Sequence, residues 1–274
     1  MRRKQKIDDG IVTLLACILL FITFYPFFML LCGSLKDKMQ LLENPWFFTT
    51  PMYFHNYEVA ATQILRPLLN SFLVTAIGIV CTLLFSALAA YVIANYDIPG
   101  KKFFYYYIIS LLMVPGFVIL IPQFLVVRDM KLYNTYLGQI LPPTANNVAM
   151  GVMLMTTFFG TIPKSIIESA RVEGCGSVQM FLKIVVPLSK PIMATVAITT
   201  GLNLWNNYMW PLIITTGQEV TPVIVAITRL TASIQEGNGP IFAAYVIASI
   251  PILVLFAFAS KQFISGLTAG AVKG

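Results

Sequence analysis

Long uncharged, apolar stretches alternate with short charged segments along almost the whole chain. The charge-free runs occupy residues 11–35, 67–96, 103–127, 132–163, 191–218 and 237–260. About 20 consecutive apolar residues cross a bilayer as a helix, so each run is long enough to do so. The pattern predicts an all-α, polytopic membrane protein with six transmembrane helices. We expect the spans at about 11–35, 67–94, 103–127, 142–160, 191–214 and 241–260.

Composition supports this interpretation. Hydrophobic residues make up 58% of the chain and charged residues 11%, and the mean hydropathy is +0.81. A soluble domain carries about 25% charged residues, so a soluble fold of this size is excluded. Six spans and their connections take up nearly all 274 residues. We therefore expect one transmembrane domain over 1–274 and no separate soluble domain.

The basic residues indicate topology rather than nucleic-acid binding. The net charge is +7, but Lys and Arg lie between the apolar runs instead of forming one basic face. With the N-terminus inside, 12 of the 18 basic residues fall in inner segments and 6 in outer ones, which by the positive-inside rule predicts that both termini are cytoplasmic. The first run follows Arg2-Arg3-Lys4 but is about twice as long as a signal-peptide core, so we expect it to be retained as a helix.

The cysteines and the histidine do not indicate a disulfide framework, a metal site or a catalytic site. The four cysteines, Cys17, Cys32, Cys81 and Cys175, form no CxxC motif and no pair on one outer loop. We expect them to be packing residues. The single histidine, His55, cannot build a metal site alone, so no metal and no catalytic set is expected.

Two further classes of protein are disfavoured. The Gly100-Lys101-Lys102 sequence has Asn95 where a P-loop needs its first glycine, and no Ser or Thr follows the lysine. The chain is therefore not expected to bind ATP or another cofactor by itself. No predicted span contains Asp, Glu, Lys or Arg, which argues against an ion-coupled carrier.

The segment 161–190 differs from the runs on either side of it. It carries four basic and two acidic residues, too many for a span, yet it is too apolar for a free loop. Pro163 suits the first turn of a helix, Gly174 suits a helix end, and a second amphipathic run stops at Pro187. The segment predicts a helical hairpin held out of the membrane. On shape alone, a mere connector between two spans fits equally well.

Prolines, aromatic residues and small residues mark three other features. Pro115 and Pro122 predict a kinked helix over 103–127, because proline removes a backbone hydrogen bond. The outer loop over 36–66 is rich in aromatic residues, which suit a membrane interface or a docking surface. We expect the tail, 261–274, to be flexible and cytoplasmic.

The amino-acid sequence of the predicted hairpin resembles a known motif. Glu168-Ser169-Ala170-Arg171-Val172-Glu173-Gly174 is followed by nine residues and then Ile184-Val185-Val186-Pro187. This is similar to the EAA motif of binding-protein-dependent ABC importer permeases, E-A-A, then Gly, nine residues and I-x-L-P. The departures are Ser169 and Cys175 where the family has Ala, Glu173 for Asp and Val186 for Leu.

The resemblance extends over nearly the whole chain, to carbohydrate importer permeases and in particular their MalG-like subunit. The matching segments are Asn70-Ser71, Ala90 to Ala94 before Pro99-Gly100-Lys101-Lys102, Val114-Pro115, Ile121-Pro122, Trp205-Asn206, Trp210-Pro211 and the ending from Gly266 to Gly274. It implies a bacterial inner-membrane complex with a second, MalF-like permease, an ATPase dimer that binds ATP, and an extracytoplasmic solute-binding protein. It also implies that the hairpin is a coupling helix docked on the ATPase. The coupling residues would be Glu168, Ser169, Ala170, Arg171, Gly174, Ile184 and Pro187.

The fifth predicted span carries neutral polar and aromatic groups: Asn203, Trp205, Asn206, Asn207 and Tyr208. Amides and aromatic faces are what a sugar needs, so these residues are candidates for the translocation path. Asparagines that hold membrane helices together are the competing interpretation. The expected function is a sugar or oligosaccharide permease subunit; a permease for another solute such as glycerol phosphate or a peptide comes second, and a membrane scaffold third.

Overall fold

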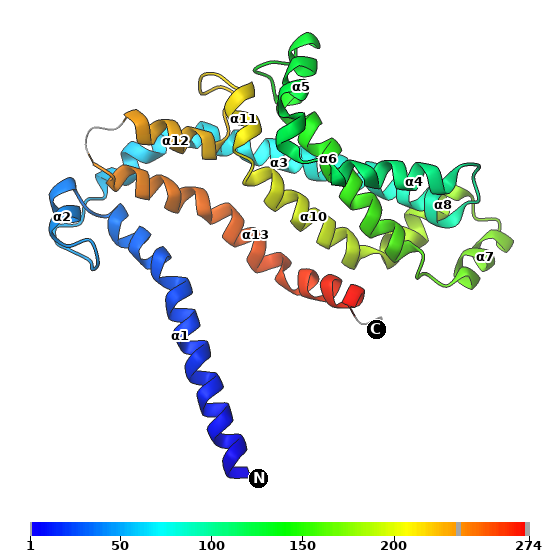
Figure 1. Ribbon diagram of the computed structural model, residues 1–274, viewed down its shortest axis with the longest axis horizontal. Coiled ribbons are helices and arrows are strands. Elements are labelled where there is room, and N and C mark those ends of the chain that lie inside the picture. The colour runs from blue at the N-terminus through cyan, green and yellow to red at the C-terminus, as the bar shows by residue number, and fades with distance from the viewer. Residues whose placement is uncertain (1, 234–236, 272–274) are drawn as a thin grey trace. The chain divides into compact units, whose positions relative to one another are not determined.

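The structure is a computed structural model that describes residues 2–233 and 237–271, and all the regular secondary structure of these residues is helical. The predicted all-α class is confirmed. In chain order the elements are α1 (Arg2–Ser34), α2 (Lys38–Glu43), α3 (His55–Asn95), α4 (Lys101–Ser110), η1 (Leu111–Met113), α5 (Gly116–Asp129), α6 (Tyr136–Phe159), α7 (Lys164–Val172), α8 (Ser177–Met180), η2 (Phe181–Val185), α9 (Val186–Leu188), α10 (Lys190–Trp205), α11 (Met209–Ile214), α12 (Val223–Ser233) and α13 (Gly239–Ala271) (Figure 1).

Contacts within the chain define two compact units. One comprises the chain up to Leu65 together with Ala226–Ile250, and the other comprises Arg66–Val225 together with the chain from Pro251 onward. The second unit contains the hairpin and the fifth predicted span. The single-domain organisation stays a prediction.

Two of the described helices are long and apolar enough to cross a membrane, Val12–Ser34 and His55–Asn95. Three pairs of helices qualify only when each bent pair is taken together. The bends are 103° between α4–η1 and α5, 81° between α6 and α7, and 78° between the α8–α9 segment and α10. Among the described residues the number of candidate spans is therefore two, or up to five, and the six-span arrangement stays a prediction.

The predicted kinked helix over 103–127 is divided in the structure into two helices, with the break at Val114 beside Pro115. There the chain leaves the helical conformation (φ −84°, ψ 118°), and Pro115 precedes the first turn of α5 in an extended conformation. A proline disfavours the α conformation of the residue before it, which accounts for the break. Pro122, in contrast, lies inside α5 without ending it.

Two helices begin earlier than predicted. α6 starts at Tyr136 rather than Pro142, because the Thr135 hydroxyl accepts a hydrogen bond from the Gly138 amide at 3.1 Å and caps the helix. α3 starts at His55 rather than at residue 67. Its first turns carry the buried residues Asn56, Ala60 and Ile64 on one face, which stabilises a helix that continues through Pro67.

Three predicted helix ends also differ. The predicted helix over 191–214 is divided at 206–208, between α10 and α11. The chain stays helical past Pro187 to Leu188, because the wider turns of η2 precede the proline and accommodate its missing N–H. The predicted flexible tail, 261–274, is helical as far as Ala271, although Gly266 and Gly270 lie within it, and its last three residues lie outside the described part of the chain.

Small residues let α3, α6 and α10 pack closely in the second unit. A Cβ atom on Gly78 would lie 2.3 Å from a Leu204 methyl group, and one on Gly151 would lie 2.2 Å from the Ser86 hydroxyl. The Ser86 hydroxyl donates to the Val148 carbonyl at 3.1 Å. Close approach through glycine and hydroxyl contacts is typical of helix packing in membranes.

Candidate coupling hairpin and translocation segment

The first arm of the hairpin is α7, a short helix with one buried side. Pro163 precedes it in an extended conformation, and its missing N–H costs nothing there. Ile167 and Ala170 are buried, whereas Glu168 and Arg171 are exposed. The arm therefore rests on its own chain and presents its charged residues outward.

Gly174 ends α7 in the left-handed conformation, with φ +80°. Its amide donates to the Arg171 carbonyl at 3.0 Å, and the Cys175 amide donates to the Ala170 carbonyl at 2.9 Å. These two bonds are the Schellman pattern, in which a residue with positive φ follows the helix and the last carbonyls are satisfied. The predicted helix end at Gly174 is thus observed, one residue after the cap at Glu173.

The second arm comprises α8, η2 and α9. Met180, Phe181 and Val185 are buried, Ile184 is half-buried and Pro187 is exposed. Buried residues on both arms form one hydrophobic cluster with the ends of α3 and α6. Its members are Ala87, Ala90, Tyr91, Met155, Phe159, Ile167, Ala170, Met180, Phe181, Val185, Ile192 and Val196.

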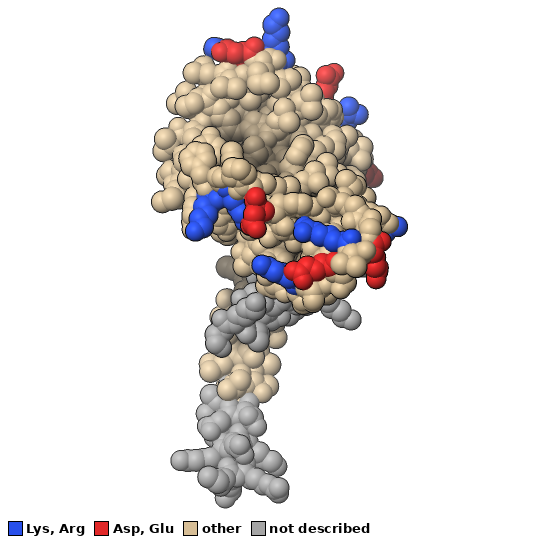
Figure 2. All heavy atoms as spheres, turned by 90° about the vertical axis from the view of Figure 1, so that its right-hand side faces the viewer, with Lys and Arg blue, Asp and Glu red and all other residues tan. Residues whose placement is uncertain are grey.

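The outward side of the hairpin is both charged and apolar. Figure 2 looks onto the end of the second unit where α7 and α8 lie, and acidic and basic side chains gather there. Val172 is 89% exposed and Val178 72% exposed. A cavity of about 370 Å³ between the arms is lined by Ser165, Ile166, Ser169, Ala170, Glu173 and Ile184. Exposed apolar side chains with a polar rim are typical of a protein-docking surface.

Two tyrosines that sequence reasoning missed connect this hairpin to the end of α3. The Tyr91 hydroxyl donates to the Ser177 carbonyl at 3.0 Å and lies 3.2 Å from the Tyr96 hydroxyl. The Arg171 guanidinium lies 5.6 Å from the centre of the Tyr96 ring. A hydrogen bond from the Ser177 side chain and the positive charge of Arg171 hold the pKa of Tyr96 below its ordinary value. No spacing in the sequence links these residues, because about 80 residues separate Tyr91 from the hairpin.

The five polar and aromatic residues of the fifth predicted span do not share one face. Asn203 and Asn206 are exposed, and three positions apart they lie on the same side of the chain. Trp205 is 9% exposed and lines an apolar cavity of about 760 Å³ with residues of α3, α10 and α13. Asn207 and Tyr208 are half-buried, and the Asn207 side chain accepts from the Trp210 amide at 3.4 Å.

Two further amide side chains line another cavity of the second unit. They are Gln123 of α5 and Asn146 of α6, and the volume of this cavity is about 540 Å³. α6 and α10 run in opposite directions, as three contacts between them indicate. Thr144 of α6 and Leu204 of α10 both lie beside Gly78 of α3, and Gly151 of α6 lies beside Val196 of α10. The Trp210 indole, just after α10, donates to the Gly138 carbonyl of α6 at 3.0 Å. This register brings residue 203 opposite about residue 145.

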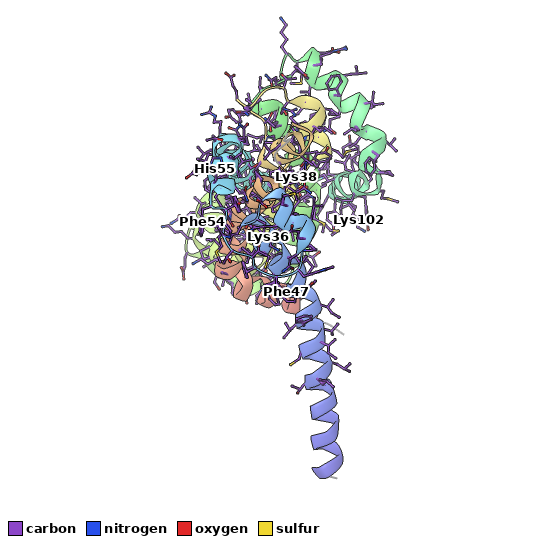
Figure 3. All side chains as sticks on the ribbon, turned by 90° about the vertical axis from the view of Figure 1, so that its left-hand side faces the viewer. Lys36, Lys38, Phe47, Phe54, His55 and Lys102 are labelled. Carbon is purple, nitrogen blue, oxygen red and sulfur yellow. The ribbon has the colours of Figure 1, made fainter. Side chains whose placement is uncertain are left out.

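The segment between α1 and α3 forms a second exposed surface, in the first unit. Lys36 is fully buried, its ammonium group donates to the Asn44 carbonyl, and its own carbonyl accepts from the Asn56 amide group at 2.8 Å. Phe47 is 67% exposed and Phe54 64% exposed (Figure 3). A buried polar anchor therefore holds a segment whose aromatic rings face outward.

Metal chemistry finds no support in the part of the chain that the structure describes. No group of three His, Cys, Asp or Glu residues lies close enough together to hold an ion. His55 pairs with Glu58 at 3.0 Å on the surface, and the four cysteines are unbridged.

Comparison with known proteins identifies the family. Residues 82–268 match the family described as "Binding-protein-dependent transport system inner membrane component". The chain belongs to this family. It is 33% identical over its full length to the whole of the melibiose/raffinose/stachyose import permease MelC of Bacillus subtilis. It is 29% identical, over 100% of this chain and 99% of the relative, to the arabinooligosaccharide permease AraQ of Halalkalibacterium halodurans.

A solved structure agrees in fold. It is described as a bacterial ABC transporter involved in the import of the acidic polysaccharide alginate, with a TM-score of 0.82 and 21% identity over 95% of this chain and 98% of that one. The chain is a permease subunit of an ABC importer, an inner-membrane component rather than an enzyme. The resemblance predicted from the EAA segment is therefore confirmed at the level of the family.

Proposed function

We propose that this permease subunit forms, with a second permease chain, the membrane pathway for a neutral sugar or oligosaccharide. An extracytoplasmic binding protein delivers the solute, and separate ATPase subunits that bind ATP drive transport. The observation that carries this proposal is full-length similarity to permeases named for melibiose, raffinose, stachyose and arabinooligosaccharides. The match covers 100% of this chain and 99–100% of these relatives, which fits the same role in the same kind of complex.

The six spans and their orientation belong to the proposal. α1 and α3 each cross the membrane once, α4 with α5 serves as one broken span, and α10 with α11 serves as another. α6 and α13 supply the others. Both termini and the hairpin then lie in the cytoplasm, in keeping with the 12-to-6 distribution of basic residues.

The hairpin from Lys164 to Leu188 is proposed as the coupling element. Its buried side is satisfied by its own chain, and its exposed side presents Glu168, Ser169 and Arg171 with nearby apolar side chains. An ATPase docked there can shift the permease between two states only if its contacts differ between them. A lever that is rigid before docking satisfies this requirement.

Exposed amides support a neutral solute. Asn203 and Asn206 lie beside the break in the fifth predicted span, and irregular backbone at membrane depth is tolerated where it is buried or lines a water-filled cavity. Among the described residues, no side chain of Asp, Glu, Lys or Arg belongs to α10 after Lys190 or to α11. Amide groups hydrogen-bond to sugar hydroxyls without requiring a charge on the solute.

Uptake measurements test this function. The chain is expressed with its genomic neighbours, and import of labelled raffinose, arabinooligosaccharide, glycerol phosphate and an oligopeptide is measured in cells or proteoliposomes. Import of a neutral saccharide that depends on the binding protein and on ATP is expected. Import of only the anionic or peptide solute would contradict the sugar assignment, and no import of any of them would contradict the proposed pathway.

The amides can be tested in the same assay. Asn203→Leu is expected to lower saccharide uptake about tenfold or more, because an unpaired solute hydroxyl is left in the pathway. Leu202→Met, on the neighbouring position, is the matched control and should transport normally. Unchanged uptake by Asn203→Leu, with weaker association of the second permease, would assign the amide to helix packing instead.

A further inference from the structure

The most extensive polar contact made by the hairpin is with α3, a helix to which it is not directly joined. The hairpin is connected in the chain to α6 on one side and α10 on the other. α3 ends at Asn95, and about 70 residues separate this end from Lys164. A movement of the hairpin reaches α3 only through side-chain contacts.

Tyr91 makes the contact with the second arm. It is 5% exposed, its hydroxyl donates to the Ser177 carbonyl at 3.0 Å, and its ring lies 5.1 Å from that of Phe181. The Ser177 carbonyl belongs to the first turn of α8. One tyrosine thus holds both the backbone and a side chain of this arm.

Tyr96 makes the contact with the first arm. Its ring packs edge-on against Tyr91 at 5.5 Å, and the Arg171 guanidinium lies over its face at 5.6 Å. Because the Tyr91 proton is committed to Ser177, the Tyr96 hydroxyl donates to the Tyr91 oxygen. The two tyrosines therefore link Arg171 on one arm and Ser177 on the other to the same helix end.

We propose that Tyr91 and Tyr96 form a clamp that makes α3 move with the coupling hairpin. They are positioning residues: they do not touch solute or nucleotide but pass the displacement of both arms to a third helix. The inference rests on the proposed coupling role of the hairpin. Coupling of this kind requires a physical connection whose arrangement both sites influence, and the clamp supplies one.

Tyr91→Phe in the assembled importer tests the clamp. The variant keeps the ring against Phe181 and removes only the hydroxyl. We expect the ATPase to co-purify and its basal hydrolysis to be unchanged, while saccharide import and stimulation by the binding protein fall about five- to tenfold, the effect of one lost hydrogen bond to a buried carbonyl. More ATP is then hydrolysed per solute imported.

Tyr106→Phe is the matched control. It removes the same oxygen from a tyrosine on α4 that is 66% exposed, so import and coupling should not change. Tyr96→Leu is the second test, because Tyr96 is half-buried and leucine keeps an apolar side chain at that position. It should uncouple the importer as Tyr91→Phe does, and the double variant should lose little more than either single one, because both act in one contact.

The outcomes separate the clamp from the proposed function. Coupled import by both Tyr91→Phe and Tyr96→Leu at the parental rate would overturn the clamp and leave the permease function intact. Loss of the whole complex from the membrane in Tyr91→Phe, with normal coupling in Tyr96→Leu, would show that the tyrosine only stabilises the fold. An unmodified importer that moves no saccharide would contradict the proposed function itself.

Discussion

Substitutions of Gly174 provide the sharpest test of the hairpin's coupling role, because at this position the effect of backbone strain can be separated from that of steric clashes. Its φ of +80° disfavours any side chain, yet a Cβ atom placed there would meet no atom within 4 Å. A substitution therefore destabilises the turn through backbone strain alone, by about 1–2 kcal/mol for an L-residue in the left-handed region. That corresponds to a roughly 5- to 30-fold smaller population of hairpins with the native turn.

The strain predicts an order of effects. Asn adopts the left-handed conformation more readily than Ala, and the β-branched Val least readily. Import and stimulated ATP hydrolysis should fall in the order Gly, Asn, Ala, Val, with Ala about five- to tenfold below the parent. The measurement is saccharide uptake and ATP turnover by the reconstituted importer, with the amount of inserted chain determined by quantitative immunoblotting.

Gly176→Ser is the control for this series. Gly176 lies two positions away, is equally open to solvent, and has φ −68° just before α8, where serine is a preferred capping residue. It should transport at the parental rate. If Gly174→Ala and Gly174→Val equalled it, the left-handed turn would not matter for coupling and the hairpin would be only a connector.

Three further predictions follow from the same structure. Glu168→Lys places a cation on the exposed side of α7; the chain should still insert, but the ATPase should co-purify poorly, and firm attachment with parental import would contradict the docking role of this residue. In a background without native cysteines, an impermeant thiol reagent should label His55→Cys but not Glu168→Cys in intact cells, and the reverse pattern would overturn the predicted topology. The purified chain alone should hydrolyse no ATP, and turnover by a contaminant-free preparation would contradict the need for a separate ATPase.

The hairpin was predictable because local residue types determine it. Pro163 and Gly174 have conformational preferences that act within a few residues, and the apolar positions of α7 repeat with the helical period. The family motif lies on the same residues. Fold class and the candidate coupling site could therefore be predicted from the sequence.

The breaks in the apolar runs could not be predicted as easily. Pro115 ends a helix whereas Pro122, Pro67 and Pro142 lie within helices, and the difference depends on the caps and neighbours of each turn. A proline alone therefore predicts a disturbance but not its outcome. The same holds for the division of α10 from α11 at 206–208, which precedes Pro211 in the first turn of α11.

Contacts between distant residues were beyond the reach of pattern analysis. The Asn70 amide group donates to the Thr221 carbonyl at 3.0 Å, and the Gln139 amide group donates to the Val220 carbonyl at 2.7 Å. These bonds join residues about 80 and 150 positions apart. Buried amides in apolar helices predict that partners exist but do not name them.

Trp205 shows why the polar and aromatic residues of the fifth predicted span could not be assigned to one solute-binding face from the sequence. In the sequence it stands beside asparagines and suggests a sugar-stacking ring, but two positions along a helix correspond to nearly opposite sides. In the structure Trp205 is buried and lines an apolar cavity with residues of α3 and α13, whereas Asn203 is exposed. Substitution of Trp205 should therefore lower the stability of the folded chain more than it changes solute recognition.

The hairpin's two sides explain how a short segment can act as a lever. Ile167 and Phe181 secure its inner side in a core shared with α3 and α6, so the arms are ordered before any partner binds. If the hairpin docks on an ATPase as proposed, little binding free energy is needed to order the segment, and more of it is available to shift the permease between states. This division assigns different consequences to the two sides: changes at Glu168 alter docking, whereas changes at Ile167 alter the stability of the lever itself. Because Tyr91 and Tyr96 join this hairpin to the end of α3, the proposed clamp predicts that a displacement of the hairpin reaches α3 as well as α6 and α10, its neighbours in the chain.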